Sequence, residues 1–165
     1  MKKFNKLFLP LILISTSLTA GDKLYSFIGI QGSSTKIDST NVPTIGFKYG
    51  KQSRHTRTTI AYNYGKKSKV KYQTLLLEID TGIFQNSFKN VSLKPYIGAT
   101  IGMLQENDRL TSIRDRGYVF GPNVGLTYIM NDAFDFDLGY KYLKTSKLNN
   151  ISEINDVTLS MHYFY

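Results

Sequence analysis

Apolar and polar residues alternate with a period of two along most of the chain, and this alternation predicts β-strands. In the clearest segment, between Ala133 and Lys144, aromatic and leucine side chains fill the even positions, while charged residues and glycine fill the odd positions up to Lys141. We expect eight such strands, at residues 24–32, 42–50, 57–65, 70–84, 93–104, 117–130, 133–144 and 154–165. No segment beyond residue 20 shows a helical period over ten or more residues.

Eight strands of this length fit a bilayer, which a tilted strand crosses in about 9–11 residues. An open sheet would leave two unpaired edges, and in lipid no water can satisfy their N–H and C=O groups. The pattern therefore predicts an all-β fold, an eight-stranded antiparallel up-and-down transmembrane β-barrel. Its outer loops should be longer than its inner turns, and three odd-numbered connections, at 33–41, 105–116 and 145–153, are expected to be long. The third, at 66–69, is short for an outer loop, and the fourth, at 85–92, is long for an inner turn.

Aromatic residues provide a second test, because lipid-facing Tyr and Phe gather at the two membrane interfaces. When strand direction is alternated, one outward band forms at the expected periplasmic end, from Tyr49, Tyr128, Phe134, Phe136, Tyr163 and Tyr165. The other band contains Tyr62, Tyr64, Tyr118, Phe120, Tyr140 and Tyr142. Aliphatic residues such as Ile45, Leu126 and Leu159 lie between the bands. A general preference of aromatic residues for strands would not sort them in this way.

The first 20 residues are expected to be a cleaved signal peptide. Three lysines precede a short apolar run from Leu7 to Ile14, and small residues up to Ala20 follow it. The run is too short for a membrane helix, which needs about 20 apolar residues. We therefore expect a signal peptide at 1–20, a barrel domain at 21–165, and export by the Sec pathway to the bacterial outer membrane.

The composition excludes several kinds of site and partner. The chain has no Cys, so disulfides and Cys-ligated metals are excluded, and no cofactor motif is present. Its net charge is +9, and removing the three leader lysines leaves 18 basic against 12 acidic residues, a net of +6. Export and the absence of a recognition motif argue against a nucleic-acid partner.

The inward faces of the strands carry charges of both signs. We predict an interior network made of Lys48, Arg57, Glu78, Asp80, Lys94, Asp135, Asp137 and Lys141. Charges this desolvated must be paired, so we interpret the network as structural rather than as an ion path. Inward glycines, such as Gly98 and Gly125, should make room for larger neighbours.

The surplus positive charge gathers in the third connection, in Lys66, Lys67, Lys69 and Lys71. This cluster is either a solvated hairpin tip or a contact for polyanions, such as the phosphates of lipopolysaccharide or a host or matrix polyanion. In the fifth connection Arg109, Arg114 and Arg116 alternate with Glu106, Asp108 and Asp115, and we interpret that connection as a self-compensated loop.

The leader, the eight amphipathic strands and the terminal alternation of Val157, Leu159, Met161, Tyr163 and Tyr165 resemble the small outer-membrane β-barrel superfamily. This superfamily includes the OmpA transmembrane domain, OmpX-like proteins and opacity-type porins. The resemblance implies that the barrel-assembly machinery recognises the C-terminal strand, and we expect a monomer in contact with outer-membrane lipid.

Some enzymes also have a small outer-membrane barrel fold, so the chain could contain catalytic residues. Only His55 and His162 can serve as imidazole bases, and His162 has Ser160 one pleat away with Asp135 or Asp137 nearby. We interpret His162 as a hydrogen-bonded interior residue and expect no enzyme and no metal site. The sequence predicts a structural or surface-interaction role through outer loops. A small porin-like channel and a soluble lipocalin-like ligand carrier remain as alternatives.

Overall fold

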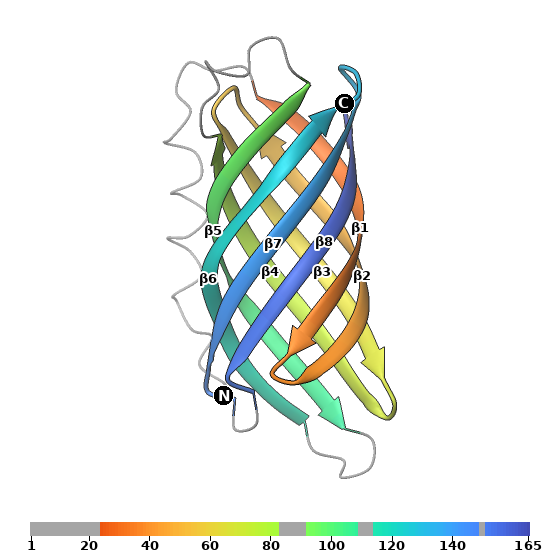
Figure 1. The fold of residues 1–165 in the computed structure, drawn as a ribbon, viewed down its shortest axis with the longest axis vertical. Coiled ribbons are helices and arrows are strands. Elements are labelled where there is room, and N and C mark those ends of the chain that lie inside the picture. The colour runs from red at the N-terminus through yellow and green to blue at the C-terminus, as the bar shows by residue number, and fades with distance from the viewer. Residues whose placement is uncertain (1–23, 83–91, 109–113, 149–150) are drawn as a thin grey trace, which may run out of the picture.

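The computed structural model describes residues 24–82, 92–108, 114–148 and 151–165, so the predicted signal peptide lies outside the described residues. Eight strands are present: β1 (Tyr25–Ile37), β2 (Thr40–Gln52), β3 (Thr56–Lys67), β4 (Val70–Gly82), β5 (Leu93–Asp108), β6 (Arg114–Ile129), β7 (Phe134–Ser146) and β8 (Glu153–Phe164). Each strand pairs antiparallel with the next, and β8 pairs with β1, which closes the barrel (Figure 1). The predicted fold class is confirmed. Among the described residues, no helix has the length and hydrophobicity to span a membrane.

The barrel has two distinct ends. The terminal end carries the first residue of β1 and the last of β8, and it lies at the top of Figure 1. The far end carries the β1–β2, β3–β4, β5–β6 and β7–β8 connections and lies at the bottom. The strands are 12 to 16 residues long, which exceeds the roughly 9–11 that a bilayer requires.

The far-end connections are shorter than the sequence predicted. The first was expected to be a long loop at 33–41, but β1 and β2 remain paired up to Ile37 and Thr40, and only Asp38 and Ser39 form the turn. The prediction was wrong because Ser33, Ser34 and Thr35 continue the antiparallel ladder with β2. Strand pairing also shortens the fifth connection, since β5 reaches Asp108 and β6 begins at Arg114.

The pleat sorts the side chains onto two faces, as the period of two predicts. Large apolar side chains cover the outside of the barrel, including Ile45, Phe47 and Leu159, whose exposed fractions are 69%, 68% and 61%. Most members of the two predicted aromatic bands are exposed on this outer face, including Tyr49 and Tyr163 near the terminal end and Tyr62 and Tyr118 toward the far end.

Polar side chains fill much of the inside, and glycines make room for them. A Cβ atom at Gly98 would overlap the Asp80 carboxylate, and one at Gly125 would overlap the Tyr96 hydroxyl. The interior is therefore packed by large side chains that reach across from one strand to another.

Candidate functional site

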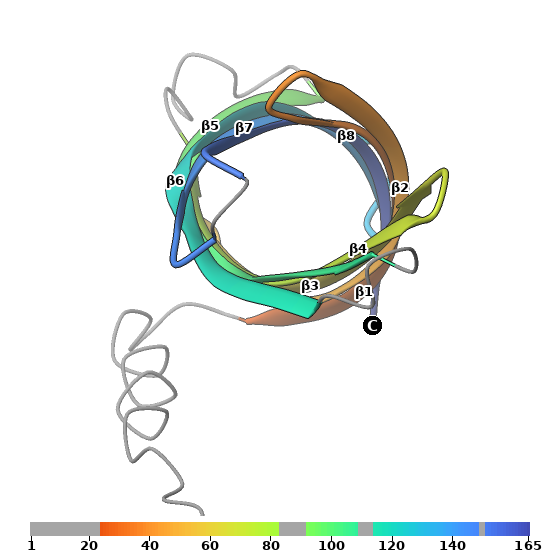
Figure 2. The same ribbon diagram turned by 90° about the horizontal axis from the view of Figure 1, so that it is seen from below.

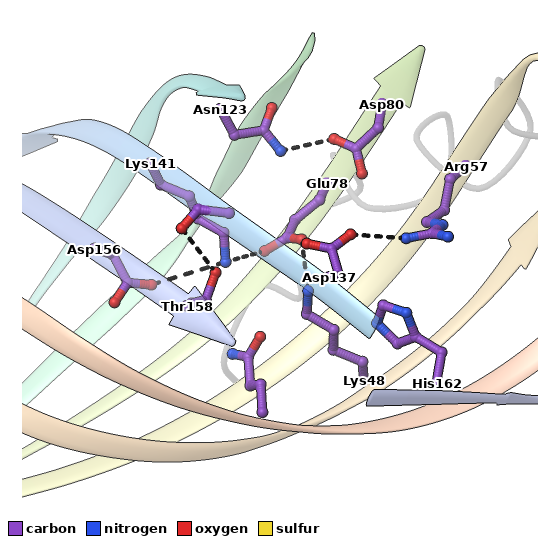
Figure 3. Close-up of polar contacts among 12 residues, drawn as sticks. Lys48, Arg57, Glu78, Asp80, Asn123, Asp137, Lys141, Asp156, Thr158 and His162 are labelled. Carbon is purple, nitrogen blue, oxygen red and sulfur yellow. Dashed lines mark hydrogen bonds and ion pairs between the residues drawn. The ribbon is translucent and has the colours of Figure 1, made fainter. Parts of the chain in front are cut away.

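Arg57 on β3 organises a buried ion cluster in the terminal half of the lumen (Figure 3). Its Nη2 lies 2.6 Å from Asp135 Oδ2, and its Nη1 lies 3.0 Å from Asp137 Oδ2. His162 Nδ1 lies 2.6 Å from the other oxygen of Asp135, and the Tyr96 hydroxyl donates to Asp137 Oδ1 at 2.7 Å. Asp135 and Asp137, which are neighbours on the inward face of β7, thus bind the same guanidinium. Its planar group of N–H donors can contact two carboxylates at once.

A second cluster surrounds Glu78 on β4. Lys141 Nζ lies 2.6 Å from Glu78 Oε1 and 3.8 Å from Asp156 Oδ2, and Lys48 Nζ lies 3.7 Å from Glu78 Oε2. These side chains are nearly inaccessible to solvent, with exposed fractions of 7% or less. Asp156 also accepts a hydrogen bond from Thr35 at 2.7 Å, so β1, β2, β4, β7 and β8 meet here.

Six of the eight residues predicted for the interior network are ion-paired in these two clusters. Asp80 is buried and accepts a hydrogen bond from Asn123 at 2.7 Å. Lys94 differs from the prediction: it shares the inward face but is exposed at the mouth of the terminal end, because it is only the second residue of β5. Sequence reasoning missed Asp156, although it lies on the same face as Thr158 and Ser160.

An apolar plug fills the lumen toward the far end. Each of the eight strands contributes one buried residue to it, and these are Ile37, Val42, Ala61, Leu76, Leu104, Val119, Leu143 and Ile154. Ile151, from the β7–β8 connection, joins this cluster, and Leu148 packs against it. Figure 2, which looks into the far end, shows the described ends of this connection turned inward at one side of the ring of strands.

The sequence interpretation did not anticipate the plug. Its signal was nevertheless present, since Leu143 follows Lys141 on the inward face of β7, and Leu76 precedes Glu78 on that of β4. The lumen therefore has an apolar zone near the far end and a charged zone nearer the terminal end. A small cavity of about 60 Å³ lies at the terminal mouth, lined by residues that include Arg57, Asp80 and Lys94.

The candidate catalytic set inside the barrel is not assembled as a triad. His162 is completely buried and bonds to Asp135, but within the described residues its Nε2 and the Ser160 hydroxyl each lack a hydrogen-bond partner. A nucleophilic serine requires a base within hydrogen-bond reach, so this pair has no activated nucleophile. No cluster of three or more His, Asp or Glu side chains suited to a metal ion occurs in the described residues.

The β3–β4 hairpin carries the predicted basic cluster at the far end. It ends in a tight turn in which Ser68 has a φ of 53°, and Figure 2 shows it projecting beyond the ring of strands. Lys66, Lys67 and Lys69 are exposed, and Lys71 is half-buried. Lys66 lies directly opposite Lys71 in the strand register. Like charges in this position repel each other, so the pair is costly without an anion to neutralise it.

Strand pairing also changes the interpretation of Arg114 and Arg116. Their segment was expected to form a self-compensated loop, but both residues belong to β6, and Glu106 belongs to β5. The pleat places Arg114 and Arg116 on the outward face, whereas Glu106 and Asp115 occupy the inward face. The basic and acidic residues are thus separated onto opposite faces. Arg109 lies outside the described residues.

No protein-family model matches the chain, and no curated protein matches it by sequence. Solved structures do resemble it. Neisserial surface protein A is 15% identical, with 88% of this chain and all of that chain covered at a TM-score of 0.70. Outer membrane protein H of Pseudomonas aeruginosa is 19% identical, with 86% and 99% covered at a TM-score of 0.63.

The outer membrane enzyme PagL is also similar, at 11% identity, with 82% and 97% covered and a TM-score of 0.51. Because one of these structures is described as an enzyme, the shared architecture does not by itself separate enzymes from other barrels. The closed ring of eight strands, the apolar exterior and these structural matches lead to one conclusion: the chain has the fold of the small outer-membrane β-barrels.

Proposed function

We propose that this protein is an integral, non-conducting barrel of the bacterial outer membrane that contacts phosphorylated glycolipid through its basic far end. The exposed apolar wall supports the membrane location, because a soluble protein rarely leaves a large continuous apolar surface in water. A lipocalin-like carrier would instead place its apolar side chains around an internal ligand. Here the outside is apolar, and the inside holds ion clusters beside an apolar plug whose side chains pack against one another.

The filled lumen supports the proposal that the barrel does not conduct. Eight strands enclose just enough space for side chains, and here the apolar plug and the ion clusters occupy that space. A porin-like role would need a polar path through the ring of plug residues. Lys48, Arg57 and Lys141 each lie within 4 Å of a buried carboxylate, which supports a structural network rather than an ion path.

The outward-facing side chains of the C-terminal strand support assembly by the barrel-assembly machinery. Val157, Leu159 and Tyr163 are exposed on the lipid-facing side of β8, and this alternation is the feature by which the barrel-assembly machinery would recognise the chain. The predicted signal peptide and Sec export, and a monomeric state, belong to the same proposal.

The basic β3–β4 hairpin carries the proposal of a surface role. Exposed lysines gather at the far end, opposite the first residue of β1 and the last residue of β8, and this is the extracellular end if β1 begins on the periplasmic side. Lysine ammonium groups act as point charges for phosphate, and the outer leaflet presents a dense layer of lipopolysaccharide phosphates. Contact with that layer offsets the repulsion between Lys66 and Lys71.

The test replaces Lys66, Lys67 and Lys69 with Ser in the full mature chain refolded in zwitterionic detergent. Each cation near an anionic lipid surface contributes about 1 kcal/mol, so binding of purified lipopolysaccharide should weaken by about 100-fold. The affinity of the unaltered barrel should also fall as salt increases. Isothermal titration calorimetry at low and high salt measures both effects.

A matched control replaces Lys51, Arg54 and Lys94 with Ser, which removes the same charge from exposed positions at the terminal end. This control should bind lipopolysaccharide like the unaltered barrel. Equal losses in the two triple variants would reject the hairpin contact. Binding of heparin but not of lipopolysaccharide would redirect the function to adhesion on a host or matrix polyanion.

A further inference from the structure

Resting on the proposed function, we propose that the outer wall of β3–β6 holds a specific binding site for one phosphorylated, acylated glycolipid of the outer leaflet. Its headgroup contacts a ladder of polar side chains, and one of its acyl chains lies in an apolar groove beneath that ladder. The site extends the hairpin contact from general attraction to a defined position on the wall.

The polar ladder crosses four strands. Arg116 Nε donates to Gln105 Oε1 at 2.7 Å, Gln105 Nε2 donates to Gln73 Oε1 at 3.2 Å, and Gln73 Nε2 donates to the Tyr62 hydroxyl at 3.1 Å. All of these residues are on the outward face, so the ladder lies on the wall rather than in the lumen. The contacts hold the guanidinium through Nε, and its two terminal nitrogens are the groups that suit a phosphate.

A row of cations lies directly beyond this ladder. In the register, Lys66 pairs with Lys71, Lys71 with Asn107, and Asn107 with Arg114. The acidic residues nearby, Glu106 and Asp115, occupy the inward face of the same strands. This outward-facing surface is rich in cations and hydrogen-bond donors. It is therefore complementary to an anionic headgroup that has several hydrogen-bond acceptors.

The apolar groove lies on the same strands, farther from the far end. It has a volume of about 390 Å³, and its lining includes Leu77, Ile79, Ile101 and Phe120 around the small side chain of Ala99. The groove exists because Ala99 is flanked across the register by Ile79 and Pro122, and along β5 by Ile97 and Ile101. A methyl group among larger side chains leaves a depression in the wall.

The order of these features matches the order of groups in a glycolipid. From the far end, the outward rows are cations, then amides with Arg116, then Leu75, Met103 and Tyr118, and then the groove. Arg116 and Phe120 are four residues apart on β6, about 13 Å along the strand. A phosphate at the ladder therefore places its acyl chain over the groove.

Two single variants test the two halves of the site separately. Arg116→Gln should weaken binding of bisphosphorylated lipid A at least about tenfold and leave binding of dephosphorylated lipid A unchanged, because only the charge-assisted contact is lost. Ala99→Phe fills the groove and should weaken binding of both lipids. Native mass spectrometry of the refolded mature barrel in detergent measures retained lipid.

Two control variants make the same kinds of substitution at positions away from the proposed site. Lys51→Gln removes a cation at the terminal end, and Val157→Phe adds an aromatic ring to the outer wall at β8. Heat-modifiable gel mobility verifies folding, and Ala99→Leu replaces Ala99→Phe if the larger ring prevents folding. The inference is overturned if Arg116→Gln and Ala99→Phe retain lipid as well as their controls do.

The result also separates this inference from the proposed function. If the hairpin lysine variant loses lipopolysaccharide while Arg116→Gln and Ala99→Phe do not, the specific site is rejected and the general contact stands. If the unaltered barrel retains neither lipopolysaccharide nor lipid A, both are rejected.

Discussion

Arg57 shows at the scale of one residue how charge can be placed inside the barrel. Two of its nitrogens contact Asp135 and Asp137, its Nε donates to Gln52 at 2.6 Å, and its guanidinium lies 5.4 Å from the centre of the Phe27 ring. A buried ion pair adds little net stability, because desolvation offsets the attraction. Removing one partner is different, since it leaves the other charge buried and unpaired.

We therefore expect Arg57→Met to destabilise the barrel by about 3–5 kcal/mol, because Asp135 and Asp137 would keep their burial and lose their cation. Urea unfolding in detergent micelles, followed by gel mobility, measures the change. Lys94→Met is the control, since Lys94 is exposed at the mouth and a change there should stay within about 0.5 kcal/mol. Equal effects in both variants would contradict a structural role for the Arg57 cluster.

At the scale of elements, two-residue turns join β1 to β2 and β3 to β4 at the far end, which also carries the connections from β5 to β6 and from β7 to β8. Asp38 links the β1–β2 turn to the end of the β7–β8 connection, because its carboxylate accepts hydrogen bonds from the amides of Ser152 and of Glu153, the first residue of β8, at 3.1 and 3.2 Å. Its own amide donates to the Glu153 carbonyl at 3.1 Å, and its φ is 48°, a conformation that Asp and Asn tolerate better than most residues. One side chain thus ties the β1–β2 turn to the β7–β8 connection, whose Ile151 belongs to the plug.

Asp38→Ala should loosen this link, because two amides lose their acceptor and the backbone conformation becomes less favourable. A lost acceptor costs about 1–3 kcal/mol, so hydrogen exchange at the Ser152 and Glu153 amides should accelerate roughly 5- to 150-fold. Asp38→Asn keeps an oxygen acceptor and should exchange nearly as slowly as the unaltered barrel. Unchanged exchange in Asp38→Ala would mean that other contacts hold the connection.

At the scale of the whole molecule, the barrel is an inside-out protein with a filled interior. Apolar side chains cover the outer wall, and the lumen contains an apolar plug beside a charged zone. Such a molecule should fold only where lipid or detergent covers the wall.

We expect a flat trace in planar bilayers, because the eight plug residues close the lumen from all strands. Recordings are made with the refolded mature barrel, and a larger porin inserted under the same conditions confirms that conductance steps are detectable. Discrete steps from the unaltered barrel would show that the plug or the ion clusters open, and the porin-like alternative would then replace the non-conducting one.

The sequence by itself determined the fold class, the number of strands and the face of nearly every side chain. These follow from a period of two, which is a local property of an extended chain and needs no knowledge of distant residues. The two aromatic bands followed in the same way once strand direction was alternated. The inward positions of Arg57 and Asp137 were predictable for the same reason, although 80 residues separate them.

Only the tertiary structure decided which inward groups meet and where the wall carries a site. The height of each residue depends on the stagger between strands, which closure of the barrel fixes. That stagger places one apolar residue of every strand in the plug, leaves Lys94 at the mouth, and aligns Gln73, Gln105 and Arg116 across the wall. Pairing also turned predicted loops into strand ends, because backbone groups of polar residues join the ladder as readily as those of apolar ones.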